Sequence, residues 1–153
     1  MRRQRLGIMG GTFDPIHNGH LAIARAAMDA MALDWVLFIP DYLPPHKAAG
    51  WAPAGDRMAM TLLATMDEPR FLVSDMELVR KGPSYTVDTM RILHRRWHRF
   101  YDLYFIIGGD SAEALDTWCR IEETMRYCTF LAIARVGYRH RHEEAIKRLA
   151  QKV

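Results

Sequence analysis

Two histidines, His17 and His20, stand three residues apart at the end of a glycine-rich segment. The segment from 10 to 20 reads G-G-T-F-D-P-I-H-N-G-H. If a helix begins there, side chains with this spacing lie on one face, so that both imidazoles can donate to the same group. Two such donors beside a phosphate would stabilise negative charge that develops during group transfer.

The residues before the histidines favour the same kind of ligand. Gly10 and Gly11 allow the backbone to approach a ligand closely, and the Thr12 hydroxyl adds a donor. The first turn of a following helix would offer free N–H groups and the positive end of its dipole. The segment matches neither the Walker pattern nor G-x-G-x-x-G. We therefore predict a phosphate-binding loop of another kind.

Simpler roles for the histidines stay open at this stage. Each could be a helix cap or a core residue. A zinc site would need a third ligand, for which His46 is conceivable, but the chain has no H-E-x-x-H pattern and no C-x-x-C pair. We expect no metal held by protein ligands alone.

Short apolar runs alternate with helical patterns along the chain, which predicts strands joined by crossover helices. The fold class that follows is α/β, a doubly wound and mostly parallel sheet of about five strands with helices on both faces. Ligands bind such sheets at the carboxyl ends of the strands. The strands are expected at Leu6 to Met9, Trp35 to Ile39, Phe71 to Val73, Leu103 to Ile107 and Cys128 to Ala134.

Two helices illustrate the helical patterns. An apolar stripe at Met58, Leu62 and Met66 predicts a helix capped by Asp56. The residues from 145 to 153 predict a final amphipathic helix. The basic cluster from 94 to 99 is interpreted as a solvated helix face.

Composition limits the function classes. The 153 residues predict one domain over 1–153, and the formal net charge of +3 suits small anions without requiring nucleic acid. The two cysteines form no pair pattern, which favours a reducing, cytoplasmic compartment. No apolar stretch approaches the roughly 20 residues that a membrane helix needs.

Several blocks together resemble the adenylyl- and cytidylyltransferases that carry a T/H-x-G-H motif on a nucleotide-binding, Rossmann-like α/β fold. Within that superfamily they are similar to bacterial nicotinate mononucleotide adenylyltransferase. The blocks follow the order of that family and cover almost the whole chain. They are the segments 10–21, I-P-D-Y-L-P-P-H-K at 39–47, G-P-S-Y-T-V-D-T at 82–89, F-I-I-G-G-D-S at 105–111, Trp118 and A-R-V-G-Y at 134–138.

The resemblance implies a reaction. ATP would transfer its AMP moiety to nicotinate mononucleotide, giving nicotinate adenine dinucleotide and pyrophosphate, in NAD biosynthesis. Mg²⁺ would arrive on the ATP phosphates, and a homo-oligomer is compatible with the sequence. The implied catalytic residues are His17, His20 and Lys47, the ATP-binding residues are Gly10, Gly11, Thr12, Phe13, Asp110 and Arg135, and the substrate-binding residues are Ser84, Tyr85, Thr86 and Trp118.

Taken alone, several of these residues have simpler interpretations. Lys47 and Arg135 could be solvated surface residues, and Trp118 could be core packing. Asp110 follows a Gly-Gly turn, where it could accept hydrogen bonds from ribose hydroxyls or act as a helix N-cap. Both roles of Asp110 are compatible with each other.

The sequence also departs from the family. An I-S-x-T-x-x-R-like segment, which in that family helps to bind ATP, is not found after Tyr138, so we expect weaker ATP affinity or turnover. Two other hypotheses stay open. One is phosphopantetheine adenylyltransferase, which shares the phosphate loop but not the segments at 44–47 and 84–86 or Trp118. The other is a truncated nucleotide-binding module without catalysis.

Overall fold

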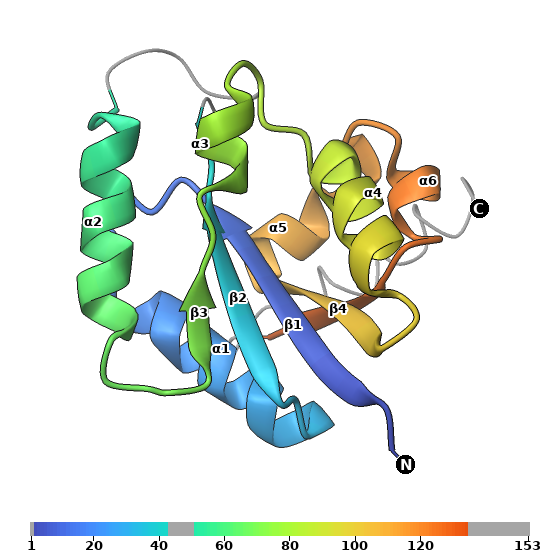
Figure 1. Ribbon diagram of the computed structural model, residues 1–153. Coiled ribbons are helices and arrows are strands. Elements are labelled where there is room, and N and C mark those ends of the chain that lie inside the picture. Colours follow the sequence, from blue (N-terminus) through green and yellow to red (C-terminus); the bar gives the residue numbers. More distant parts are fainter. Residues whose placement is uncertain (1, 43–50, 135–153) are drawn as a thin grey trace.

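The computed structural model describes residues 2–42 and 51–134, and these form one layered α/β unit (Figure 1). Its strands are β1 (Gln4–Gly11), β2 (Trp35–Pro40), β3 (Phe71–Val73), β4 (Tyr101–Gly108) and β5 (Thr129–Ile133). Its helices are α1 (Asn18–Met31), α2 (Ala54–Thr65), α3 (Met76–Arg80), α4 (Thr86–Trp97), α5 (Gly109–Glu113), the 3-10 helix η1 (Leu115–Thr117) and α6 (Ile121–Thr124).

All five strands are parallel, in the order β3-β2-β1-β4-β5. Each strand falls on one of the apolar runs, so the predicted fold class is confirmed. The chain first builds outward from β1 to β3 and then crosses back to β4 and β5. This reversal makes the β1/β4 boundary a topological switch point, where the loops after the two strands separate and leave room for a ligand.

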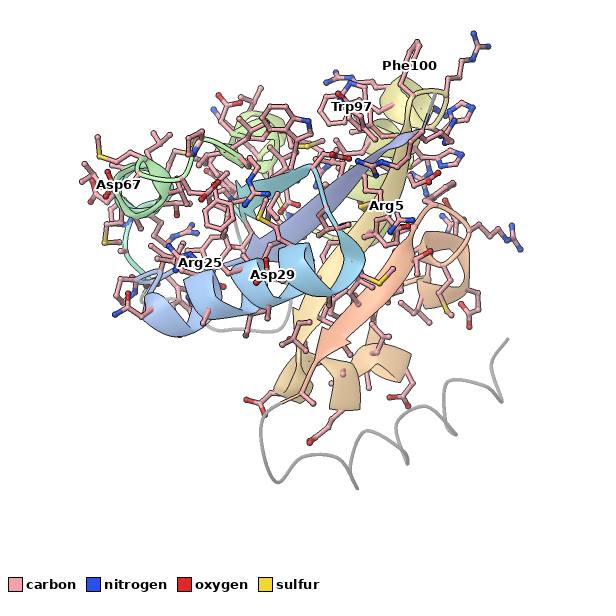
Figure 2. All side chains as sticks on the ribbon, turned by 90° about the horizontal axis from the view of Figure 1, so that it is seen from below. Arg5, Arg25, Asp29, Asp67, Trp97 and Phe100 are labelled. Atoms are coloured by element: carbon pink, nitrogen blue, oxygen red, sulfur yellow. The ribbon has the colours of Figure 1, made fainter. Side chains whose placement is uncertain are left out.

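The two faces of the sheet are covered by different helices (Figures 1 and 2). Leu6 and Ile8 of β1 belong to the core cluster that contains Met90 of α4, whereas Met9 belongs to the cluster that contains Met28 of α1. This alternation follows from the period of two along a strand. Figure 2 shows α1 on one side of the strands and Trp97, the last residue of α4, on the other.

Helix α2 differs from the prediction in its cap and in its buried face. It begins after Pro53 rather than at Asp56, and its most buried side chains are Arg57, Thr61 and Thr65. In the predicted apolar stripe, Leu62 and Met66 are 48% and 71% exposed, and Met58 is half-buried.

The polar face of α2 can be buried because its polar groups have partners. The Thr61 hydroxyl donates to the Arg57 carbonyl at 2.9 Å, and that of Thr65 donates to the Thr61 carbonyl at 2.8 Å. A hydrogen-bonded polar group loses little when it leaves water. An expectation based on an apolar stripe does not take such partners into account.

The remaining sequence predictions have mixed outcomes. Arg95, Arg96 and Arg99 in the basic cluster are exposed, as predicted. The helix expected at 145–153 lies outside the described residues. Within residues 2–42 and 51–134, no helix combines the length and apolar character needed to cross a membrane.

Candidate active site

A cleft of about 670 Å³ lies at the carboxyl ends of β1, β2 and β4. Every predicted site residue that the structure describes lines this cleft. Lys47 and Arg135 lie outside the described residues, so their placement stays a prediction. The sequence blocks around 10–20, 84–86 and 108–118 are thus brought together although they are far apart in the chain.

The loop after β1 is shaped by Gly11 and Phe13. Phe13 adopts a left-handed backbone conformation with φ of 51°, and its ring is 3% exposed. A Cβ atom on Gly11 would lie 3.0 Å from the Phe13 ring, which is tighter than ordinary van der Waals contact. Glycine at position 11 therefore allows the loop to fold back over its own phenylalanine. The Thr12 hydroxyl donates to Asp41 Oδ2 at 3.2 Å.

The two histidines cap helix α1 and reach the cleft at the same time. His17 Nδ1 accepts from the Gly19 N–H at 3.1 Å, and His20 Nδ1 accepts from the His17 N–H at 3.1 Å. Their rings stack with centroids 3.8 Å apart. Because each Nδ1 is an acceptor, the proton of each neutral ring is on Nε2. The capping role considered from the sequence therefore holds the two imidazole rings side by side where they line the cleft.

Asp110 lies where β4 ends. The N-cap of α5 is Gly108, and Asp110 stands in the first turn of α5 with an exposed side chain that lines the cleft. The interpretation of Asp110 as the N-cap is therefore wrong. The geometry leaves its carboxylate at the cleft, where it can accept hydrogen bonds from hydroxyl groups.

The opposite side of the cleft is formed by the start of α4. Tyr85 is the N-cap and Thr86 is the first helical residue. The first turn of a helix has N–H groups without helical partners and carries partial positive charge, which suits a carboxylate. The buried Ser84 hydroxyl accepts from the Tyr42 N–H at 2.9 Å, so this segment is tied to the end of β2.

Trp118 is partly packed against other aromatic rings and partly open to the cleft. Its ring makes edge contacts with Phe105, at a centroid distance of 5.8 Å, and with Phe130, at 6.1 Å. It is only partly buried and lines the cleft. A flat aromatic surface held in this way can stack on a planar ring.

Glu77, on α3, is a cleft residue that the sequence analysis missed. Its side chain is 7% exposed, and its Oε2 accepts from the Thr89 hydroxyl at 2.6 Å. Burial raises the pKa of Glu77 to about 7, against the opposing effects of the Thr89 hydrogen bond and the positive charge of Arg80. Helix α3 is too short to leave a periodic signal, so nothing in the sequence marked this carboxyl.

Arg57 and Asp41 were also missed. They form a buried ion pair, with Arg57 Nη1 3.2 Å from Asp41 Oδ1. Asp41 directly follows β2, at the end of the sheet where ligands bind. That position is a signal that could have identified Asp41. Arg57 lies on the polar face of α2, which the sequence pattern predicts to face solvent.

Among residues 2–42 and 51–134, no group of three or more His, Cys, Asp or Glu side chains could hold a metal ion. The zinc hypothesis involved His46, which lies outside the described residues. The expectation that the protein itself holds no metal stays a prediction.

Known proteins similar to this chain share one activity in their names. The sequence profile of the cytidylyltransferase-like family matches residues 8–148. A "Probable nicotinate-nucleotide adenylyltransferase" of Corynebacterium kroppenstedtii is 48% identical over 135 residues, 88% of this chain and 64% of that protein. Its namesake in Thermus thermophilus is 48% identical over 134 residues, 88% of this chain and 71% of that protein. The chain therefore spans less than two thirds of the Corynebacterium protein.

Solved structures show the same fold. Plasmodium falciparum nicotinic acid mononucleotide adenylyltransferase complexed with NaAD aligns with a TM-score of 0.77 at 18% identity, over 95% of this chain and 71% of that one. The same enzyme complexed with APC aligns with a TM-score of 0.74 at 17% identity, over 95% and 70% of the two chains. At these identities, the likeness concerns the arrangement of the sheet and helices.

Proposed function

Because this chain belongs to the cytidylyltransferase-like family and, within it, to the nicotinate-nucleotide adenylyltransferases, we propose that it transfers AMP from ATP to nicotinate mononucleotide. The observation that carries the proposal is one cleft with two unlike sides. The His17 and His20 pair and the loop after β1 suit a polyphosphate, and the start of α4 with Trp118 suits a planar carboxylate.

The proposed reaction is a single displacement at phosphorus. A phosphate oxygen of nicotinate mononucleotide attacks the α-phosphorus of ATP and forms a new P–O–P link. The bond between the α-phosphorus and the bridging oxygen breaks, and pyrophosphate leaves with that electron pair. No group on the protein needs to be covalently modified, since positioning and charge stabilisation supply most of the catalysis in such transfers.

The residues on the phosphate side would stabilise charge. The Nε2–H groups of His17 and His20 would donate to the α-phosphate oxygens, where negative charge increases as the nucleophile adds. The loop from Gly10 to Phe13 would enclose the phosphates, and Asp110 would accept from the ribose hydroxyls. Lys47 and Arg135 are assigned to the phosphates by the family resemblance.

On the other side, the acceptor would bind by its ring and its carboxylate. The backbone at Ser84, Tyr85 and Thr86 would donate to the pyridine carboxylate, aided by the positive end of α4. Trp118 would stack on the pyridine ring. The same arrangement does not suit phosphopantetheine, which has no aromatic ring.

In this proposal, Mg²⁺ would enter the cleft bound to the phosphates of ATP. Two of the aspartates that line the cleft already have protein partners, since Asp14 Oδ2 accepts from the Ala52 N–H at 2.9 Å and Asp41 pairs with Arg57. The ion would hold phosphate oxygens and water and would neutralise charge on the leaving pyrophosphate. A cytoplasmic location and a homo-oligomer stay predictions.

Pyrophosphate release with ATP tests the proposal, with nicotinate mononucleotide or phosphopantetheine offered as the acceptor. We expect product with the pyridine nucleotide alone. Product with phosphopantetheine alone would replace the proposal by that activity. Tight nucleotide binding by calorimetry with no product from either acceptor would instead indicate a binding module.

A further inference from the structure

Arg57 is a charged side chain buried against the loops that follow β1 and β2. It is 1% exposed, and it is the largest of the fully buried side chains in the described part of the chain. Removing a guanidinium from water costs several kcal/mol unless its charge and its donors are matched. The partners of Arg57 therefore indicate why this residue stands there.

Most of those partners are backbone carbonyls in loops. Arg57 Nη1 donates to the carbonyls of Thr12 at 2.8 Å and of Asp41 at 2.7 Å. Its Nη2 donates to the Tyr42 carbonyl at 3.1 Å, and its Nε donates to the Ala52 carbonyl at 2.9 Å. One guanidinium thus donates hydrogen bonds to backbone carbonyls in the loop after β1, in the loop after β2 and in the segment that leads into α2.

Further hydrogen bonds extend this arrangement across the cleft. The Asp41 N–H donates to the Gly11 carbonyl at 2.9 Å, and the Thr12 hydroxyl donates to Asp41 Oδ2 at 3.2 Å. The Tyr42 N–H donates to the Ser84 hydroxyl at 2.9 Å. The phosphate loop and the start of α4 are therefore connected through residues that Arg57 holds in place.

We propose that Arg57 is a positioning residue that fixes the phosphate loop relative to the acceptor side of the cleft. The inference rests on the proposed function, because a transfer between two bound substrates needs a fixed separation between their sites. A displacement of about 1 Å can cost about a hundredfold in rate. A planar guanidinium can hold carbonyls through three separate nitrogens, whereas a lysine ammonium has all three of its N–H donors on one nitrogen.

The experiment compares Arg57→Lys with Arg91→Lys in the full chain. Arg91 is the matched control because it pairs with Glu123 at 2.6 Å and joins α4 to α6 away from the cleft. We expect Arg57→Lys to lower kcat about a hundredfold with less than about a threefold change in the Kd of either substrate. Arg91→Lys should keep the kcat of the parent. All measurements are made well below the melting temperature of each variant.

Amide hydrogen exchange gives a readout that needs no turnover. In Arg57→Lys, the Asp41 and Tyr42 N–H groups should exchange at least about tenfold faster than in the parent, and in Arg91→Lys at the parental rate. Should Arg57→Lys not fold, Asp41→Asn removes the ion pair and leaves one side-chain acceptor for Arg57 and Thr12 in place of two, and we expect kcat to fall about fivefold to tenfold at similar Kd.

The outcomes separate the two proposals. An unchanged kcat in a folded Arg57→Lys, or an unchanged exchange rate at both amides, would overturn the positioning role. So would an increase in Kd as large as the loss in kcat, because that pattern indicates binding rather than alignment. If the parent itself forms no product, the proposed function fails, and the exchange rates still decide whether Arg57 holds the two loops.

Discussion

The two sides of the cleft are held in place by contacts that differ greatly in their separation along the chain. On the β1 side, the hydrogen bonds that orient the histidine pair join residues two or three apart in the chain. On the β2 side, most hydrogen bonds around Arg57, Ser84 and Glu77 join residues 12 to 45 apart. The first side is a local motif, and the second exists only once the sheet and α2 have come together.

This difference matters for stability as well as for chemistry. On the histidine side, His17 is exposed and His20 is half-buried, so the two rings stay partly hydrated and little free energy is lost in placing them there. The β2 side buries a carboxyl and a guanidinium, whose desolvation must be offset by hydrogen bonds. Changes on the β2 side should therefore alter the free energy of unfolding, and changes to the histidines should alter kcat.

The largest effect on stability is expected at Glu77. Its pKa of about 7 in the folded chain lies above the ordinary value of 4.5, so the stability that Glu77 contributes is fully present below pH 4.5 and is lost as the pH rises through 7. The loss amounts to about 3 kcal/mol by linkage. Glu77→Gln, which resembles the protonated acid, should match the parent near pH 4 and exceed its free energy of unfolding at pH 8.

Urea unfolding at the two pH values measures this difference. Ser84, Thr89, Arg80 and Asp41 surround the Glu77 carboxyl and are unchanged in the variant. Equal pH dependence in Glu77→Gln and the parent would show that the Glu77 carboxyl does not titrate in this window. The β2 side of the cleft would then not contain a carboxyl whose ionisation is opposed by burial.

The histidines should show the opposite pattern. We expect His20→Ala to lower kcat by about a hundredfold, the usual cost of removing a donor to a developing anion. His17→Asn keeps a capping side chain but lacks the Nε2–H donor, so it should lower kcat by at least about tenfold without loss of stability. Steady-state kinetics and thermal unfolding separate the two properties. Full activity in His17→Asn would leave the cap as the only role of His17.

What the sequence could predict follows the same division. The strands and the start of α1 after the glycine-rich loop depend on neighbours in the chain, and the sequence predicted them. Glu77 and Arg57 have their main contacts with residues distant in the chain, and no short window of sequence contains both halves of such a contact. The apolar stripe on α2 gave a wrong prediction of the buried face, because predictions from helical periodicity assume that polar side chains face water. Thr61 and Thr65 avoid that cost by bonding to their own helix.

The glycines at the end of β1 give a smaller effect that tests the local packing of the loop after it. Gly11→Ala should destabilise the chain by about 1 kcal/mol, because the new Cβ lies 3.0 Å from the buried Phe13 ring. Gly10→Ala is the control, since its Cβ would meet Phe105 at an ordinary 3.6 Å. Thermal unfolding of both variants without ligand measures the difference. Equal melting temperatures would show that Phe13 moves aside freely and does not shape the loop.

The smallest effect is expected on the outer face of α2, where Leu62→Gln should change the free energy of unfolding by less than about 0.5 kcal/mol. Leu93→Gln on α4 is its matched control, because Leu93 is 1% exposed whereas Leu62 is 48% exposed. That control should lose about 3 kcal/mol or more. If Leu62→Gln were as costly, α2 would bury its apolar stripe and turn Arg57 away from Thr12 and Asp41. The smallest prediction thus tests the helix orientation on which the positioning role of Arg57 depends.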